Sequence, residues 1–511
     1  MNLTRPAICD CLLLGLLAAL ASLTSVSCSE TAQPSGSAGA GGANATAGNG
    51  NGGAGITAGS PGMAGNTTAS GGGGAAAAGA AGAGTSGGGG GATETTCTIT
   101  VPPAMPSSEI ATVGIVEFST DLAGLSKAEI EFGPDTNYGM VAPVDLTAPS
   151  YRTLLLGMKQ RTEYHFRVVA TGTAGTCRGQ DQTIMTGSLP NGLPEIEVET
   201  EAGAEASLYG GFLITGAYVS GGGGSGSPAY IIDKDGDVVW AFNVGSDVTG
   251  ARLSFDGKFM WINKANVPSG QANVHRVTMD GLTDEDLSDE MAGLNHELTV
   301  LPDESIAYFA YGNNGCDDIK IRRPNGMVET LINSGTATGG NSCHCNGIDY
   351  SAEDNSLVVS ELNSNKYFKV KIDDKSLVWV LGGSGTNDFT GDGSTWNRQH
   401  GVDVLAADRL VFFNNNAANM GGSLAVELQL DLTANTATKV WTYEAMPAIT
   451  NDIMGDVQRL KNGNTIVAYS TKGVVHEVSA EGMLLEEWSW PIGGAFGYVE
   501  KRKTLYGPPE L

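Results

Sequence analysis

Apolar and polar residues alternate along most of the chain after residue 97, and the 3.6-residue period of an amphipathic helix is almost absent. Alternation with a period of two is typical of half-buried β-strands. Between the apolar runs lie short clusters of Gly, Asp and Asn, which are common turn residues. The pattern predicts an all-β protein built from many short hairpins.

The hairpins between residues 202 and 511 form two interleaved series. The outer series places turn residues before a strand rich in Val and Trp, at 233–240, 279–282, 323–328, 373–379, 431–441 and 480–484. The inner series consists of strand, turn and strand, at 252–263, 298–309, 348–360, 402–413 and 457–470. A four-stranded blade needs both hairpins, and the outer copies mostly recur at the roughly 40 to 50 residue interval of propeller blades. Six outer copies predict a six-bladed β-propeller over 202–511, completed by a strand within 496–507. A double β-sandwich is the rival architecture.

A smaller all-β region precedes the propeller. Residues 95–188 contain alternating runs such as 108–120 and 162–173, separated by turns, over about the 100-residue length of a small sandwich. This region is expected to be a fibronectin-like β-sandwich. The run Leu-Pro-Asn-Gly-Leu-Pro at 189–194 is expected to act as a hinge.

The beginning of the chain is a targeting and tether region. Residues 1–28 have the basic residue and short apolar run of a secretory signal, and they end in Ser-Val-Ser-Cys, which is similar to a bacterial lipobox with Cys28 as the lipidation candidate. Residues 29–94 are Gly, Ala, Ser, Thr and Asn with almost no large apolar side chain, so they predict a disordered linker. The sequence therefore predicts an exported lipoprotein, periplasmic or at the cell surface and anchored to the outer membrane or cell envelope. This lipid anchor is the only membrane contact expected.

The net charge limits the classes of binding partner, and the cysteine positions indicate the expected disulfides. The net charge is −27, from 28 basic and 55 acidic residues, which argues against nucleic acid because phosphate binding needs a basic face. In an exported chain, disulfides are expected, here between Cys97 and Cys177 and between Cys316 and either Cys343 or Cys345. The triplet 343–345 lacks the Cys-x₂-Cys spacing of structural zinc sites, so no metal is expected there.

Three of the six histidines recur at one place in the repeat. His296, His344 and His400 each stand at the start of an inner strand–turn–strand run. In a repeat architecture that closes on itself, equivalent positions converge on the axis. A single histidine at a strand start is more often structural, but three in equivalent register favour a shared site.

Several segments of the propeller region, taken in order, resemble the bacterial arylsulfate sulfotransferases. They lie at 233–240, 252–260, 296–298, 344–350, 379–383, 399–400 and 455–465. The resemblance implies an exported six-bladed propeller with an N-terminal β-sandwich. It also implies transfer of a sulfuryl group from a small aryl sulfate to a phenol, with no cofactor and no nucleotide sulfate. By the same resemblance, His400 is the nucleophile that is transiently sulfurylated, and His296 and His344 assist binding and proton transfer.

The chemistry of these side chains agrees with that role. A neutral imidazole is a nucleophile at neutral pH, and a covalent intermediate divides a difficult exchange into two displacements. A second histidine can serve as acid and base, and nearby donors can stabilise the sulfuryl oxygens.

One departure from the family concerns a basic residue. Leu362, with Glu361 beside it, stands where the family carries an active-site arginine. Arg398 is the first candidate to replace it, before Arg252 and Arg459, and Asn346 is a second substrate-binding candidate. The missing arginine favours an alternative, a non-catalytic surface-binding or scaffold propeller derived from such enzymes. A metal-dependent hydrolase with three histidine ligands is a third hypothesis.

Overall fold

The computed structural model describes most of the chain after residue 92. The described ranges are 93–218, 226–264, 273–312, 315–416, 421–490 and 495–510. The expected signal peptide, the lipidation candidate Cys28 and nearly all of the expected linker lie outside them. Across these ranges, no helix has both the length and the apolar character needed to cross a membrane.

The first folded region consists of short antiparallel strands around one apolar core. One sheet contains β5 (Lys127–Gly133), β6 (Met140–Pro143), β8 (Glu163–Gly172), β9 (Gly175–Arg178) and β10 (Gln182–Met185). Another contains β2 (Met105–Pro106), β3 (Gly114–Val116) and β7 (Thr153–Leu155), and β1 (Ile99–Thr100) pairs with β4 (Ser119–Thr120). Val116 and Leu155 from one sheet share a buried cluster with Phe166 from the other, so the two sheets pack face to face. The Cys97–Cys177 disulfide confirms the predicted pairing.

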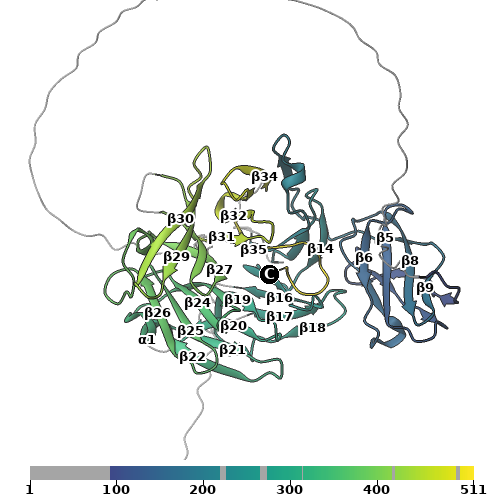
Figure 1. Ribbon diagram of the computed structural model, residues 1–511, viewed down its shortest axis with the longest axis horizontal. Coiled ribbons are helices and arrows are strands. Elements are labelled where there is room, and N and C mark those ends of the chain that lie inside the picture. The colour runs from purple at the N-terminus through teal and green to yellow at the C-terminus, as the bar shows by residue number, and fades with distance from the viewer. Residues whose placement is uncertain are drawn as a thin grey trace, which may run out of the picture. The chain divides into compact units, whose positions relative to one another are not determined.

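In the described part of the chain, the propeller region contains six antiparallel sheets, which Figure 1 shows around a common axis. The first blade combines β12 (Phe212–Tyr218), β13 (Ala229–Ile232), β14 (Val238–Phe242) and β35 (Ala495–Arg502). The second contains β15 (Gly250–Leu253), β16 (Phe259–Lys264), β17 (Asn273–Thr278) and β18 (Asp284–Asp286), and the third β19 (Leu294–Val300), β20 (Ile306–Tyr311), β21 (Asp317–Arg322) and β22 (Val328–Asn333). These sheets have the order expected for meandering blades.

The remaining three blades follow in chain order. The fourth contains β23 (Cys345–Ser351), β24 (Ser356–Glu361), β25 (Lys366–Lys371) and β26 (Leu377–Gly382). The fifth contains β27 (Gln399–Ala406), β28 (Arg409–Asn414), β29 (Leu424–Asp431) and β30 (Thr436–Glu444), and the sixth β31 (Asp456–Arg459), β32 (Thr465–Tyr469), β33 (Val474–Val478) and β34 (Leu484–Ser489). Each outer turn predicted from the sequence joins the last two strands of a blade. The predicted six-bladed propeller is confirmed.

Two strands distant in sequence complete the ring. β35 pairs with β12, with Leu213 opposite Lys501, so the last strand of the chain is the innermost strand of the first blade. β11 (Glu197–Thr200) adds a fifth strand to the sixth sheet through β34. β11 therefore enters this sheet upstream of the start expected at 202. A closed ring leaves few exposed sheet edges.

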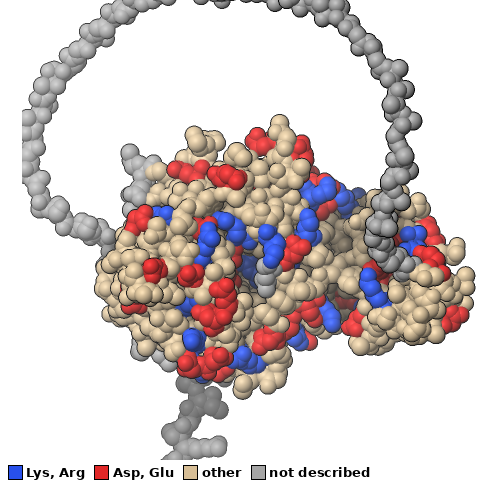
Figure 2. All heavy atoms as spheres, in the orientation of Figure 1, with Lys and Arg blue, Asp and Glu red and all other residues tan. Residues whose placement is uncertain are grey.

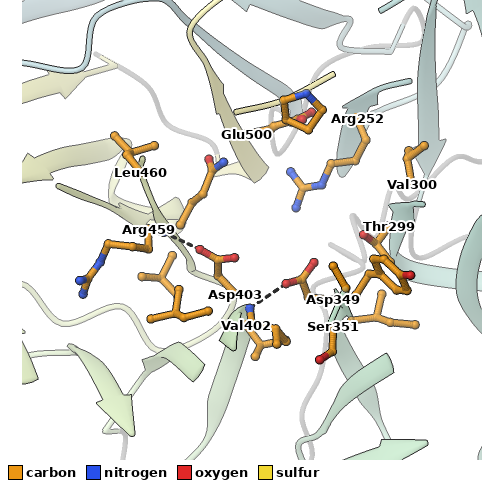
Figure 3. A pocket seen from close by; sticks show the side chains of 18 of the residues that line it. Arg252, Thr299, Val300, Asp349, Ser351, Val402, Asp403, Arg459, Leu460 and Glu500 are labelled. Atoms are coloured by element: carbon orange, nitrogen blue, oxygen red, sulfur yellow. Dashed lines mark hydrogen bonds between the residues drawn. The ribbon is translucent and has the colours of Figure 1, made fainter. Parts of the chain in front are cut away.

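Five carboxylates link the inner strands across blade junctions, and we call Glu297, Asp349, Asp403, Asp456 and Glu500 the carboxylate ring. Each accepts a hydrogen bond from a backbone N–H of the next blade. The donors are the N–H groups of Ile348 (3.3 Å), Val404 (2.7 Å), Arg459 (2.5 Å), Val499 (2.9 Å) and Leu253 (3.0 Å), in that order. Figure 3 shows two of these bonds beside a cavity of about 500 Å³ on the propeller axis. The carboxylate ring therefore supplies acceptors for inner-strand N–H groups that face a neighbouring blade and have no partner strand on that side.

Carboxyl groups of the carboxylate ring keep their protons in the folded protein at pH values where an exposed carboxyl group is ionised. Burial and the neighbouring Asp349 carboxylate raise the pKa of Asp403 to about 8, and burial raises the pKa of Asp349 to about 6. An unfolded aspartate has a pKa near 4, about 3.9 in model peptides, so the folded state binds more protons than the unfolded state from about pH 4 to pH 8. The free energy of unfolding is therefore expected to fall as pH rises through this window.

The Asp403→Asn variant tests this pH dependence. The amide keeps an acceptor for the Arg459 N–H but cannot titrate, so the number of protons released on unfolding near pH 6 should fall by up to about one. Urea unfolding midpoints measured from pH 5 to pH 8 should decline less steeply in the variant than in the wild type. Asp135→Asn, at an exposed turn of the sandwich, is the control. An identical slope in Asp403→Asn would contradict protonation of Asp403 in the folded protein.

Candidate active site

The structure brings the three predicted histidines together at the starts of neighbouring inner strands. His296 lies in β19, His344 directly precedes β23, and His400 is in β27. The ring centroids of His296 and His344 are 4.5 Å apart. The charge of His400 affects the pKa of His296, and that of His344 affects the pKa of His400, so the three rings share one electrostatic environment.

A β-bulge lies at each of these three strands. The strand register shifts between Asn295 and Leu298, between Cys345 and Gly347, and between His400 and Asp403. The inner strands β15 and β31 pair with their neighbours without a shift. Because a bulge redirects the local side chains, the bulges and not simple strand alternation determine where the three imidazoles point.

His400 is buried and held at both ring nitrogens. Nδ1 lies 2.6 Å from Asn415 Oδ1, and the backbone N–H of Met454 donates to Nε2 over 3.2 Å. Burial lowers the pKa of His400 to about 3, although the Asn415 hydrogen bond opposes this shift. His400 is therefore neutral at neutral pH, as a nucleophilic imidazole must be.

The other two histidines are neutral for the same reason. Burial lowers the pKa of His296 well below its usual value, and the neighbouring His344 and His400 lower it further. Burial also lowers the pKa of His344, and the Glu361 carboxylate partly offsets that shift. Each neutral imidazole offers one N–H donor and one acceptor nitrogen. The resting site can therefore donate and accept hydrogen bonds without a charged histidine, and each free ring nitrogen can accept a proton.

Arg398 reaches the surroundings of His400 through an unusual backbone conformation. Its φ angle is 58°, in the left-handed region, and this breaks the strand alternation before β27. The Arg398 N–H donates to Asn365 Oδ1 over 2.6 Å, and its carbonyl accepts from the Asn415 N–H over 2.8 Å. The positive charge of Arg398 contributes to the lowered pKa of His400, so a cation lies near the candidate nucleophile.

The position of the expected arginine has a structural role instead. Leu362 is 3% exposed, and its N–H donates to the His344 carbonyl over 2.9 Å. The buried Glu361 carboxylate accepts from the backbone N–H groups of His344 (2.9 Å), Asn363 (3.0 Å) and Ser364 (3.0 Å). Both residues hold the turn that carries His344.

The other candidates from the sequence are engaged within the protein. Asn346 donates from Nδ2 to the Gln399 carbonyl over 2.7 Å and accepts at Oδ1 from Ser360 over 2.7 Å, so it joins β23 to the start of β27. Arg252 contacts Glu297 and Asp456 of the carboxylate ring. Arg459 pairs with Glu427, and Figure 3 shows its guanidinium directed away from the cavity. Among the arginine candidates, Arg398 is the one whose charge acts on His400.

Some residues of the site were not predicted from the sequence. Asn415 and Met454 contact His400 from loops after β28 and before β31. Tyr498 of the first blade donates from its hydroxyl to the carbonyl of Asn346 in the fourth blade over 2.7 Å, so its side chain crosses the axis. The Arg252 guanidinium lies 5.9 Å from the Tyr498 ring centroid, on the side of the carboxylate ring. The axial cavity is lined by Arg252, and none of the three histidines is among its lining residues.

A smaller cavity of about 260 Å³ lies beside His296 and His344. Its walls include Tyr311, Asp317 and the disulfide between Cys316 and Cys343. The disulfide confirms one of the two pairings left open by the sequence, and Cys345 is a buried free thiol. Across the described ranges, no cluster of three or more His, Cys, Asp or Glu is arranged to hold a metal ion.

The Cys316–Cys343 disulfide anchors the residue directly before His344. Replacing both cysteines with serine is expected to lower the free energy of unfolding by about 3 kcal/mol. Greater freedom at His344 should also lower any activity of the site by about 10- to 100-fold, because small displacements of reacting groups are costly. The matched control replaces Cys97 and Cys177, which should weaken the sandwich and leave activity unchanged. Equal activity losses in the two double variants would contradict a local role for the Cys316–Cys343 bond.

Lysine and arginine side chains on the face shown in Figure 2 lie among aspartates and glutamates and form no continuous basic surface there.

Residues 323–489 match the family model described as arylsulfotransferase (ASST). The matched segment contains His344, Arg398 and His400, whereas His296 lies before it. No curated protein matches the chain.

Several solved structures are similar to the chain at low sequence identity. TolB from Acinetobacter baumannii matches at 11% identity, over 68% of this chain and 80% of that chain, with a TM-score of 0.41. Virginiamycin B lyase from Staphylococcus aureus matches at 13% identity, over 57% and 87%, with a TM-score of 0.35. The β-propeller domain of Myceliophteria_thermophila Cps50 matches at 8% identity, over 53% and 83%, with a TM-score of 0.37. Likenesses of this size carry no argument about activity, and the propeller assignment rests on the strand pairing of the chain itself.

Proposed function

We propose that this chain, whose residues 323–489 match the arylsulfotransferase family, transfers a sulfuryl group from an aryl sulfate to a phenolic acceptor without a nucleotide donor. The family match supports sulfuryl transfer in general terms. The observation that carries the finer proposal is that His296 and His344 lie with their ring centroids 4.5 Å apart, while the charges of His344 and Arg398 act on His400. The adjacent 260 Å³ cavity is slightly smaller than pockets for drug-sized ligands, which suits one small aromatic ring.

In the first half-reaction, His400 Nε2 attacks the sulfur of the aryl sulfate. The N–S bond forms, the bond from sulfur to the aryl oxygen breaks, and the electron pair leaves with that oxygen. The neutral His344 or His296 stabilises the departing phenolate with an N–H hydrogen bond, and the phenolate takes its proton from water. In the second half-reaction, the free nitrogen of the same imidazole accepts the proton of the incoming phenol and later releases it to water, the phenol oxygen attacks sulfur, and the N–S bond breaks to restore His400.

Negative charge on the three sulfuryl oxygens requires a nearby cation or donor. Burial lowers the pKa of Arg398, yet an arginine remains protonated at neutral pH. In this proposal, Arg398 takes the place of the arginine that is replaced by Leu362. It would bind the sulfuryl group more tightly as charge builds in the transition state.

Replacing Arg398 with methionine tests this assignment. The variant is expected to lower kcat/KM for the aryl sulfate by about 10²-fold, and Arg398→Lys should recover part of the loss because it restores the charge without the planar geometry. Initial rates at varied donor concentration give both values. The control is Arg276→Met, which removes an arginine paired with Glu285 on the second blade. Equal kinetics in the wild type and Arg398→Met would overturn the assignment.

The overall proposal is tested with the purified full-length chain, a chromogenic aryl sulfate and phenol. Formation of phenyl sulfate that depends on both substrates supports it. No transfer from a panel of aryl sulfates would instead favour the alternative, a non-catalytic surface-binding propeller. The observation that favours this non-catalytic alternative is the buried Leu362, at the position where the family carries an arginine.

The two disulfides are consistent with an exported protein. We further propose that the chain is anchored to the cell envelope through a lipid on Cys28. Partitioning of the mature chain into detergent, and its loss in Cys28→Ser, tests the anchor.

A further inference from the structure

We propose that Asn415 is a positioning residue that fixes the hydrogen of His400 on Nδ1, so that Nε2 carries a lone pair, which the Met454 N–H must release before Nε2 can react. This inference rests on the proposed function and deepens it. Asn415 follows β28 and is completely buried. Its Oδ1 lies 2.6 Å from His400 Nδ1, which makes it the closest side-chain partner of the candidate nucleophile.

The orientation of the Asn415 amide follows from its other contacts. Nδ2 donates to the carbonyl of Asn451 over 2.6 Å and to the carbonyl of Met454 over 2.8 Å. A carbonyl oxygen can only accept, so the amide nitrogen must face these two groups and Oδ1 must face His400. An amide oxygen also only accepts, so His400 Nδ1 carries the hydrogen.

A second contact leads to the same tautomer independently. The backbone N–H of Met454 donates to His400 Nε2 over 3.2 Å, so Nε2 bears a lone pair and no hydrogen. Met454 has a φ angle of 60°, in the left-handed region, and this turns the loop before β31. The backbone on one side of the ring and the amide on the other therefore specify the same hydrogen position.

Asn415 is held by a buried network that links it to the rest of the site. Its N–H donates to the carbonyl of Arg398 over 2.8 Å, and its carbonyl accepts from the Ser423 hydroxyl over 3.0 Å. The Asn451 N–H donates to the same hydroxyl over 2.9 Å. Asn415, Ser423 and Asn451 are all fully buried. The network thus joins the nucleophile, the cation and the loop at Nε2 in one rigid arrangement.

A neutral amide suits a sulfuryl carrier better than a carboxylate would. A carboxylate at this position would stabilise the imidazolium, so Nε2 of the resting protein would be protonated and unreactive near neutral pH. The amide oxygen supports the Nδ1 hydrogen when the sulfurylated ring becomes cationic, but does not remove it. The cationic ring then remains a good leaving group for the second displacement. The other titratable or charged groups that face His400 are His296, His344 and Arg398.

The test compares the wild type with Asn415→Asp, Asn415→Leu and the control Asn325→Asp, at an exposed outer turn of the third blade. The ring nitrogen shifts of ¹⁵N-histidine-labelled protein should show His400 as the Nδ1–H tautomer in the wild type and the control. In Asn415→Leu, part of the protein should show the Nε2–H form, because only the Met454 N–H then favours the Nδ1–H form. In Asn415→Asp, the rate of transfer should fall about 10²-fold at pH 6 with an unchanged KM, and recover as pH rises above 8.

The outcomes separate this inference from the proposed function. A wild-type His400 with its hydrogen on Nε2, or a pH profile of Asn415→Asp equal to that of the wild type, overturns the role of Asn415 even if transfer is observed. If the wild type has the Nδ1–H tautomer but transfers no sulfuryl group, the proposed function is overturned. The inference that Asn415 fixes the His400 hydrogen on Nδ1 then still stands. If Asn415→Leu does not fold, the wild-type tautomer and the Asn415→Asp profile still decide the question.

Discussion

Replacing His400 with alanine is expected to lower kcat/KM for sulfuryl transfer by at least about 10³-fold, because the variant has no nucleophile for the first displacement. Direct attack by phenol on the aryl sulfate would be the only route left, aided by Arg398 and the other two histidines. The loss should appear in kcat more than in KM, since the substitution leaves the groups that bind the sulfuryl oxygens in place. Initial rates over a range of donor concentrations measure both values.

Stability and labelling measurements make this result specific. The substitution leaves the buried Asn415 Oδ1 without its partner, which should cost about 1–3 kcal/mol of unfolding free energy and leave the protein folded. Wild-type protein mixed with donor alone should gain the mass of one SO₃ group on the peptide that carries His400, and the variant should gain none. His165→Ala, which removes a histidine paired with Asp181 in the sandwich, is the control and should transfer normally. Wild-type rates in His400→Ala would rule out the assigned nucleophile.

Replacing Arg252 with methionine is expected to lower the free energy of unfolding by about 3–5 kcal/mol. Arg252 contacts Glu297, lies 3.4 Å from Asp456, and donates to the Val499 carbonyl over 2.8 Å. One side chain therefore joins the second, third, sixth and first blades. Removing it leaves two buried carboxylates without a cation, and that is more costly than the loss of a hydrogen bond between neutral groups.

The cost of this substitution should depend on pH. Burial raises the pKa of Glu297 to about 8 and also raises the pKa of Asp456, so protons can replace the missing charge when they are available. The loss in Arg252→Met should therefore be smaller at pH 5 than at pH 8. Urea unfolding followed by tryptophan fluorescence reports the propeller. Lys375→Met, which breaks an ion pair with Glu329 at a 42% exposed side chain, should cost less than about 1 kcal/mol. If Arg252→Met also lowered the free energy of unfolding by less than about 1 kcal/mol, the proposed role of Arg252 in joining the blades would be contradicted.

The blade count could be predicted because each blade has its own turn signal. The outer turns carry residues such as Asp233, Asn325 and Gly482, whose conformational preferences act locally and are visible in any single sequence. The closing strand within 496–507, observed as β35, and the Cys97–Cys177 pair could be predicted for the same reason, since strand alternation and cysteine positions are local features, whereas the partner of Cys316 was left open between Cys343 and Cys345. β11 was not expected, because a four-residue strand at an outer edge leaves little pattern in the sequence.

The site could be predicted only in part. Equivalent positions in the repeat located His296, His344 and His400, but the bulges that orient them depend on the pairing partner of each strand. The left-handed conformation of Arg398 also could not be foreseen, because it is held by contacts with Asn365 and Asn415. Asn415 stands in a run of three asparagines that is a common loop composition. Which of the three meets His400 depends on the register of β28 against β27.

Closure of the ring makes the site dependent on a strand that is distant from the histidines in sequence. β35 supplies Tyr498, which bonds to the fourth blade across the axis, and Glu500, which bonds to the second blade. A chain cleaved between β34 and β35 would therefore keep all three histidines and lose the contact that supports Asn346. In this architecture, proteolysis at a position far from the site in sequence can impair it without removing any of the three histidines.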